Sequence, residues 1–278
     1  MISYLARQSG RHDPMTKPSP NMNPRAAQTI LITGASGSIG NALAKAYAAS
    51  GITLILHGRN ESKLEQTAQA CRDQGAHVVK GVFDITDTNT LQNWVQEIDA
   101  LHPIDLLIAN QGMNINIGPE GKGESWEQTN LLLDVNLRAS MAMVHAALPG
   151  MRKRGHGQLV LISSLAAYFG LPLTPAYSAS KAGLKAYGEG LRGWLAPEGV
   201  GVTVIMPGYV KSDMCDAMPG PKTLVWSPDK AARVMKQGID KNKARITFPF
   251  FVSFETWLLA VLPASWSLKI LKLAGYHV

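Results

Sequence analysis

From Thr29 onward, short apolar runs rich in β-branched residues alternate with longer helical stretches. Strands this apolar, each followed by a crossover helix, are typical of a parallel sheet that helices cover on both faces. The chain has 278 residues, 46% of them hydrophobic, with no break in composition along most of its length, so we expect one domain. The predicted fold class is α/β, a Rossmann-type doubly wound parallel sheet in three α/β/α layers.

The alternation also predicts where the elements lie. Strands are expected over 29–33, 52–57, 77–83, 104–110, 157–164, 200–208 and 244–248. Helices are expected over about 39–50, 61–73, 88–101, 126–154, 175–195 and 228–242. The chain is thus divided into a disordered N-terminal arm (1–27), a Rossmann-fold domain (28–248) and a hydrophobic helical extension of that domain (249–278).

A glycine-rich turn, TGASGSIG (33–40), joins the first predicted strand to the first helix. Glycines let a diphosphate approach backbone N–H groups, and the helix N-terminus adds its positive dipole end. An ordinary tight turn can have the same composition, so the turn by itself is a weak signal. Its candidate cofactor-binding residues are Gly34, Ser36, Gly37, Ser38, Ile39 and Gly40.

The end of the second strand indicates which dinucleotide binds. A site that prefers NAD usually has Asp or Glu there to accept from the ribose 2′-hydroxyl, but the sequence reads His57-Gly58-Arg59-Asn60. Arg59 could instead offer its guanidinium to a 2′-phosphate, with Asn60 as a further contact. The alternative is a solvated arginine at a helix start. We expect NADP, with NADPH favoured over NADH.

Further motifs give the region from Thr29 to about Ser212 a resemblance to the short-chain dehydrogenase/reductase family. TGASGSIG is similar to that family's TGxxxGxG turn, although the usual middle glycine is Ser38. Tyr177-Ser178-Ala179-Ser180-Lys181 is its YxxxK signature, and Ser164 lies thirteen residues before Tyr177, the family's usual spacing. The resemblance implies an NAD(P)-dependent oxidoreductase that acts on CH–OH and C=O groups.

The resemblance implies more cofactor contacts. The segment 83–86 is similar to the family's adenine-contacting segment, 109–112 to its NNAG strand end, and 207–212 to the segment that meets the nicotinamide carboxamide. The implied contacts are Asp84, Ile85, Asn110, Gln111, Gly112, Tyr177, Lys181, Pro207, Gly208, Val210 and Ser212.

Four catalytic residues are implied: Asn136, Ser164, Tyr177 and Lys181. Tyr177 and Lys181 are four apart on a predicted helix and share a face. The Lys181 ammonium is expected to lower the phenol pKa of Tyr177, the acid/base, and to hold the nicotinamide ribose. Ser164 would stabilise the substrate oxygen, and Asn136 would keep a water next to Lys181. Each residue alone has an ordinary structural explanation, but their order and spacing favour catalysis.

Composition excludes several other functions. The formal net charge of +7 suits anionic ligands, but no basic run with interleaved aromatics occurs, so no nucleic-acid partner is expected. Cys71 and Cys215 have no CxxC spacing and the histidines no metal-ligand spacing, which predicts no metal and a reducing, cytoplasmic location. The polar first 25 residues do not resemble a secretory signal; a transit peptide is the lesser alternative.

The C-terminal segment 248–274 is the most hydrophobic part of the chain. The uncharged stretch between Glu255 and Lys269 is interrupted by Pro263, and it is shorter than the roughly 20 residues that a membrane span needs. Three uses remain open. The segment could roof a substrate pocket, pack against a second subunit, or lie at a membrane interface with lysines facing anionic headgroups.

The predicted function is NADP(H)-dependent hydride transfer between the nicotinamide and a carbonyl or secondary alcohol carbon of a small apolar molecule. Met214, Cys215 and Met218 follow Gly208 in the loop where the family has its substrate lid, and they hint at an apolar pocket, with Trp226 closing the same edge. Irregular core packing explains the methionines equally well. The alternative is a non-catalytic NADP(H)-binding or membrane-peripheral protein on the same fold. The resemblance also implies a homodimer or homotetramer.

Overall fold

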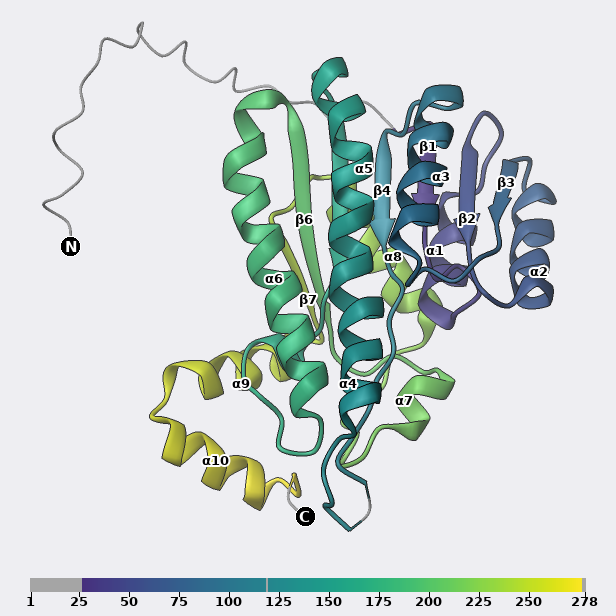
Figure 1. Cartoon of the computed structure of the whole chain (residues 1–278). Coiled ribbons are helices and arrows are strands. Elements are labelled where there is room, and N and C mark those ends of the chain that lie inside the picture. Colours follow the sequence, from purple (N-terminus) through teal and green to yellow (C-terminus); the bar gives the residue numbers. More distant parts are fainter. Residues whose placement is uncertain (1–26, 119, 277–278) are drawn as a thin grey trace, which may run out of the picture.

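A computed structural model describes residues 27–118 and 120–276 of the chain (Figure 1). Its centre is a seven-stranded sheet in the order β3-β2-β1-β4-β5-β6-β7, and every neighbouring pair is parallel. The strands are β1 (Thr29–Ile32), β2 (Thr53–His57), β3 (His77–Gly81), β4 (Leu106–Ala109), β5 (Gly157–Ile162), β6 (Val200–Pro207) and β7 (Arg245–Phe248). The predicted doubly wound α/β fold is confirmed.

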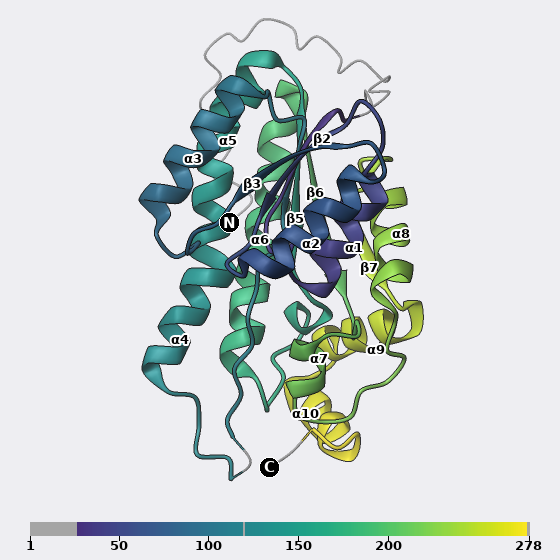
Figure 2. The ribbon, with the colours of Figure 1, turned by 90° about the vertical axis from the view of Figure 1, so that its right-hand side faces the viewer.

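Helices cover both faces of the sheet, because successive residues of each strand point to opposite sides. On one face, Ile30 and Ile32 pack with α1 (Ser38–Tyr47), α2 (Glu61–Arg72) and α8 (Pro228–Ile239). On the other face, Leu31 packs with α3 (Thr88–Leu101), α5 (Ala139–Arg154) and α6 (Pro175–Leu195). The three layers are visible in Figures 1 and 2.

Five of the seven strands end earlier than predicted, while β2 and β7 end at the predicted residues. The fourth strand, expected over 104–110, is Leu106–Ala109, and the fifth, expected over 157–164, is Gly157–Ile162. The residues that follow leave the sheet and line a cavity. Apolar sequence alone cannot separate the last paired residue from the first residue of the loop.

The helix predicted over 126–154 is interrupted. It consists of α4 (Trp126–Leu133), a π-helical turn (Asp134–Arg138) and α5. The wider turn contains Asn136, whose side chain is fully buried. By length and composition this helical stretch could cross a membrane, but just over half of its apolar window is buried inside the fold. The described residues contain no second candidate span.

Short helices without individually predicted bounds follow β6 and β7. The segment 209–227, which lies between the predicted strand 200–208 and the predicted helix 228–242, contains the short helix α7 (Asp213–Ala217). Ser212 caps α7 by accepting from the backbone N–H of Cys215. After β7, α9 (Phe250–Val261) and α10 (Ala264–Leu273) form a hairpin. The hairpin extends beyond the carboxyl edge of the sheet (yellow in Figure 1). Apart from Ala27, the arm predicted over 1–27 lies outside the described residues.

Candidate active site

A cavity of about 860 Å³ opens at the carboxyl ends of the strands, where open α/β sheets bind their ligands. It brings together eighteen of the predicted site residues: Gly34, Ser36, Gly37, Ser38, Ile39, Arg59, Asn60, Ile85, Asn110, Gln111, Gly112, Ser164, Tyr177, Lys181, Pro207, Gly208, Val210 and Ser212. Three predicted residues, Gly40, Asp84 and Asn136, do not line it.

The turn between β1 and α1 has the shape of a phosphate cradle. Gly34 has φ +62°, in the left-handed region that favours glycine. Gly37 is the N-cap of α1 and supplies no side-chain hydrogen bond, and the first turn of that helix contains no acidic residue. No side chain therefore caps the first backbone N–H groups of α1. These groups can donate to a diphosphate bound in the cavity.

Gly40 supports this turn from behind the cavity. A Cβ on Gly40 would lie 2.2 Å from the carbonyl oxygen of Gly34 and 2.7 Å from Nδ2 of Asn110. Asn110 itself donates to the carbonyl oxygens of Thr33 (3.0 Å) and Gly34 (3.2 Å). Gly40 is thus a packing residue that lets the helix approach the turn.

We expect Gly40→Ala to destabilise the fold, because the clash involves backbone and cannot be relieved by a rotamer change. Overpacking of this kind costs about 1–3 kcal/mol, measurable as a lower urea midpoint. The matched control is Gly193→Ala on α6, where an added Cβ meets nothing within 4 Å. A Gly40→Ala protein as stable as the control would contradict the packing role.

Gln111 has a structural role that its motif does not reveal. Its Oε1 accepts from the hydroxyl of Thr33 (2.5 Å), and its Nε2 donates to Oγ of Ser140 (2.7 Å) and to the carbonyl oxygen of Val135 (3.3 Å). The buried side chain therefore links the end of β1 to the π-helical turn. It fixes the distance between the turn and the opposite wall of the cavity.

The end of β2 forms the basic end of the cavity, with Arg59, Asn60 and Lys63 in its lining. Asn60 caps α2, because its Oδ1 accepts from the N–H of Lys63 (2.8 Å). Lys63 also lies 3.7 Å from a carboxylate oxygen of Asp213. No acidic side chain follows β2 that could accept from a ribose hydroxyl, since residues 58–60 are Gly, Arg and Asn.

His57 adds a polar group at the same end. Its Nε2 lies 3.1 Å from the carbonyl oxygen of Phe83, and a carbonyl only accepts, so Nε2 donates. Burial lowers the His57 pKa to about 4. The neutral ring then has Nδ1 as an acceptor, and this buried nitrogen lacks a partner among the described residues. Nothing in the sequence distinguishes His57 beyond its place at the end of the second predicted strand.

Asp84 lies at the edge of this region. Its Oδ1 accepts from the N–H and the hydroxyl of Thr86, both at 2.9 Å, and these bonds lower the pKa of the carboxyl group. Its neighbour Ile85 is buried and lines the cavity. Ile85 therefore has the position expected of a contact to a flat ring, while Asp84 shapes the local turn.

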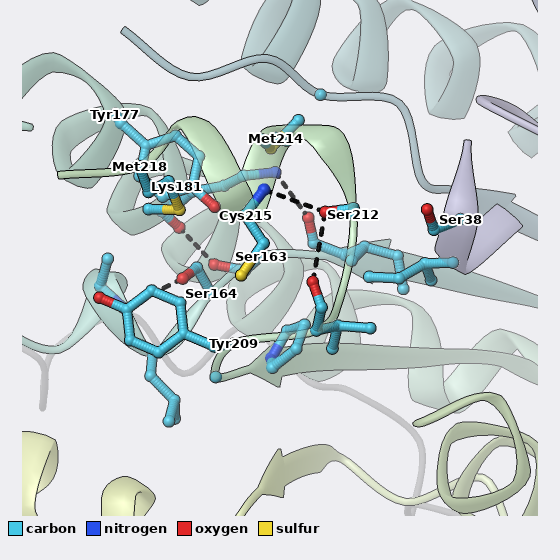
Figure 3. Close-up of a pocket in the computed structure, with 18 of the residues that line it drawn as sticks. Ser38, Ser163, Ser164, Tyr177, Lys181, Tyr209, Ser212, Met214, Cys215 and Met218 are labelled. Atoms are coloured by element: carbon cyan, nitrogen blue, oxygen red, sulfur yellow. Dashed lines mark hydrogen bonds between the residues drawn. The ribbon is translucent and has the colours of Figure 1, made fainter. Parts of the chain in front are cut away.

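Ser164, Tyr177 and Lys181 lie together on one wall of the cavity (Figure 3). Ser164 follows β5, while Tyr177 and Lys181 share a face of α6. The Lys181 ammonium lies 5.8 Å from the centre of the Tyr177 ring and donates to the carbonyl oxygen of Ile162 (2.9 Å). The neighbouring Ser163 hydroxyl donates to the carbonyl oxygen of Lys181 (2.7 Å) and so ties α6 to β5.

The expected lowering of the Tyr177 pKa is wrong for the chain by itself. Burial raises the pKa of the phenol, and a hydrogen bond with Ser164 opposes that rise only in part. Burial also lowers the Lys181 pKa to about 8. Both shifts have the same origin, because a dry site disfavours the charged form of each group. The chain therefore holds Tyr177 as a protonated phenol, the form that can donate a proton.

Asn136 uses its side chain to hold the wall behind Lys181. Its Nδ2 donates to the carbonyl oxygen of Met113 and to Oγ of Ser180, both at 3.0 Å, and its Oδ1 accepts from the N–H of Met113 (2.8 Å). A Cβ on Gly112 would lie 3.4 Å from the Lys181 nitrogen and 3.5 Å from Oδ1 of Asn136. Because Gly112 has no side chain, a gap remains between the Lys181 nitrogen and Oδ1 of Asn136.

The other end of the cavity is apolar and comes partly from segments that the family motifs do not cover. Met214, Cys215 and Met218 line it, as their pattern indicated (Figure 3). Trp226 does not line it; its ring stacks on that of Phe248, at the end of β7, with the ring centres 4.9 Å apart. The lining also includes Leu171, Tyr209 and Tyr276, which the sequence did not single out. Glu255, Thr256 and Leu271 line it too, and they belong to the C-terminal segment for which roofing a pocket was one of the three expected uses.

Comparison with known proteins identifies the family. The short chain dehydrogenase family model matches residues 28–220. An uncharacterized oxidoreductase of Myxococcus xanthus is 33% identical over 237 residues, 85% of this chain and 93% of that protein. The 3-oxoacyl-[acyl-carrier-protein] reductase FabG of Rickettsia bellii is 34% identical over 192 residues, 69% of this chain and 76% of that protein.

Solved structures agree with the fold. A short-chain dehydrogenase from Sphingobium yanoikuyae in complex with NADPH has a TM-score of 0.73 at 25% identity, covering 87% of this chain and 92% of that one. A short-chain dehydrogenase from Streptomyces avermitilis has the same TM-score at 24% identity, covering 90% and 97%. The chain therefore belongs to the short-chain dehydrogenase/reductase family and is an NAD(P)-dependent oxidoreductase of CH–OH and C=O groups.

Proposed function

We propose that this oxidoreductase uses NADP(H) to interconvert a carbonyl and a secondary alcohol on an apolar small molecule, with Tyr177 as the acid/base. The observation that carries the proposal is the meeting of Ser164, Tyr177 and Lys181 on one wall of a cavity whose other parts are a phosphate cradle and an apolar chamber. The bound cofactor supplies or accepts the hydride. The chain's own residues supply the cofactor-binding groups, the acid/base and the hydrogen bond to the substrate oxygen.

The cradle fits a dinucleotide on this chain's own features. The glycine turn and the α1 N-terminus would hold the diphosphate, and Ile85 would lie against the adenine. Between the diphosphate and the nicotinamide, the cofactor would contact Asn110, Gln111 and Gly112. The nicotinamide carboxamide would contact Pro207, Gly208, Val210 and Ser212. Lys181 would hold the nicotinamide ribose.

In the reductive direction, the Tyr177 hydroxyl donates its proton to the substrate oxygen while the carbonyl carbon is reduced. Ser164 donates a hydrogen bond to the same oxygen and stabilises the charge that develops there. Burial raises the pKa of Tyr177, so the phenol stays protonated at neutral pH, the form that this step needs. In the oxidative direction, the phenolate that accepts the proton needs the Lys181 ammonium and the positive nicotinamide beside it.

Lys181 and Asn136 have supporting roles in moving the proton. A water in the gap beside Gly112 would lie within reach of the Lys181 nitrogen and Oδ1 of Asn136. That water would return a proton from solvent to Tyr177 after each turnover. Since the Asn136 side chain is also bonded to Met113 and Ser180, we assign it a positioning role.

The NADP preference rests on Arg59 at the basic end of the cavity and on the absence of a carboxylate after β2 within residues 58–60. We expect Arg59→Ala to raise KM for NADPH by roughly 10- to 100-fold, the loss of one charge-assisted hydrogen bond of about 1.5–3 kcal/mol. KM for NADH should change by less than about twofold, since NADH has no 2′-phosphate for the arginine to hold.

Initial-rate measurements with both cofactors and a panel of ketones test this. Lys80→Ala is the control, because Lys80 pairs with Glu65 away from the cavity. Equal changes in the KM values for NADPH and NADH in Arg59→Ala would refute the proposed contact between Arg59 and the 2′-phosphate. The expected homodimer or homotetramer and the cytoplasmic location stay predictions.

A non-catalytic NADP(H)-binding protein is the alternative that the sequence by itself leaves open. It has no use for a serine, a phenol and an amine on the same cavity wall. The same ketone panel separates the two, because a binding protein would retain NADPH without consuming it.

A further inference from the structure

The C-terminal hairpin, α9 and α10, has a largely apolar inner face and an apolar outer face. The inner face helps to wall the cavity through Val252, Leu258, Leu259, Ile270 and Leu271. The outer face is exposed, and its large side chains do not line the cavity. Its large side chains are Phe250, Phe251, Phe254, Trp257, Val261, Trp266, Leu268 and Leu273.

An apolar helix of this kind is ordinarily buried. In α9, Glu255 is the only charged residue and it lines the cavity, while only Ser253 and Leu259 are buried. Phe250 is 75% exposed and Phe251 is 70% exposed. A contiguous exposed apolar surface on a folded domain marks an interaction site.

The composition of the outer face indicates what covers it. It contains five of the chain's twelve Phe and Trp residues, namely Phe250, Phe251, Phe254, Trp257 and Trp266. Phe and Trp are the side chains that anchor helices at the boundary between headgroups and acyl chains. α10 also has the exposed Lys269 one turn from Trp266, and the chain has a net charge of +7.

Charge favours a lipid surface over a second copy of the chain. A two-fold contact through α10 would bring the exposed Lys269 toward its symmetry mate, and like charges oppose such a contact. Anionic headgroups would attract this ammonium instead. The hairpin also extends from the body of the fold (Figure 1), so its outer face can reach a flat surface.

We propose that the outer face of the hairpin is a docking surface for an anionic lipid bilayer. The 12 residues of α9 would span about 18 Å, less than the ~30 Å hydrocarbon core, so the hairpin lies in the plane of the interface. Because its inner face walls the cavity, a carbonyl amphiphile dissolved in the bilayer is the substrate class that fits. The assignment of this substrate class rests on the proposed function.

Vesicle co-sedimentation of the full chain tests the docking surface. We expect binding to vesicles of phosphatidylcholine and phosphatidylglycerol, and a decrease of at least about tenfold in partitioning for the double variant F251S/W266S. The matched control is L101S/W126S, which removes two side chains that are 74% and 69% exposed elsewhere on the surface. The control should bind as the parent does.

Lys269→Gln gives an independent measure that does not alter the apolar face. It should weaken binding to the anionic vesicles about fivefold and leave binding to pure phosphatidylcholine unchanged. Failure of the parent to bind, or equal binding by parent and F251S/W266S with matched thermal unfolding curves, overturns the proposal. A dimer in sedimentation equilibrium that F251S/W266S dissociates, without vesicle binding, assigns the face to a second copy and overturns it too.

NADPH oxidation with ketones of different chain length tests the substrate class. Vesicles should raise the parent's rate with a long-chain ketone several-fold and leave its rate with a short, water-soluble ketone unchanged. F251S/W266S should lose only the increase. A vesicle-independent rate with the long-chain ketone overturns the substrate class. No turnover of any ketone overturns the proposed function, while the vesicle-binding result stands by itself.

Discussion

Replacing Tyr177 with Phe is expected to lower kcat for ketone reduction by roughly 10²- to 10⁴-fold, the range that one positioned acid/base supplies. The substitution removes the hydroxyl that donates to the substrate oxygen and leaves the ring in its buried place beside Leu132 and Ala166. The cofactor cradle is on other elements, so the dissociation constant of NADPH should change little. Steady-state kinetics and fluorescence titration with NADPH measure the two effects.

The matched control is Tyr187→Phe. Tyr187 lies on the same helix, α6, packs against the core and does not line the cavity. Its loss of a hydroxyl should leave kcat within about twofold of the parent. Normal turnover by Tyr177→Phe would refute the proposed acid/base, and equal losses in both variants would indicate a general effect on α6.

Replacing Lys181 with Met is the second large change, and we expect kcat/KM to fall by at least roughly 10²-fold. Met preserves most of the aliphatic volume but removes the ammonium that would hold the ribose and support proton transfer. It also leaves the carbonyl oxygen of Ile162 without the bond from Lys181. Unlike Tyr177→Phe, this variant should raise KM for NADPH as well as lower kcat.

The pH profile distinguishes Lys181 from a merely structural residue. Burial lowers its pKa to about 8, so the ammonium is lost as pH rises through that value and kcat/KM of the parent should fall there. Lys181→Met has no such group, so its residual activity should show no decline near pH 8. A decline at the same pH in both proteins would assign the transition to another group.

The same pKa shift has a consequence for stability with a definite sign. The folded-state pKa of about 8 lies below the ordinary 10.5, so the unfolded chain binds the proton more tightly between these values. The free energy of unfolding of the parent, relative to Lys181→Met, should therefore rise from pH 8 toward 10.5. Urea denaturation of both proteins across that window measures it.

Much of the site could be predicted because its residues follow strands. Parallel strands end at one edge of a sheet, so motifs far apart in the sequence, such as those at Gly34, Arg59, Asn110 and Ser164, had to meet there. The periodicity that predicted α6 likewise placed Tyr177 and Lys181 on a shared face. These inferences needed only local patterns and the rule that joins strands into a doubly wound sheet.

The features that were missed depend on contacts across the fold. The π-helical turn around Asn136 and the buried bonds of Gln111 to Thr33 and Ser140 join elements that local sequence does not relate. Trp226 stacks on Phe248 instead of closing the cavity, because β7 places that ring beside it. None of these follows from periodicity or motif spacing.

The sequence by itself determined the order of strands and helices, the glycine turn and the set of polar groups at the strand ends, since apolar periodicity and glycine's backbone freedom are local properties. Only the tertiary structure decided how those groups behave. Burial, which depends on the packing of the whole chain, raises the pKa of Tyr177 and lowers that of Lys181. The tertiary structure also decided that one face of the C-terminal hairpin lines the cavity while the other face is exposed.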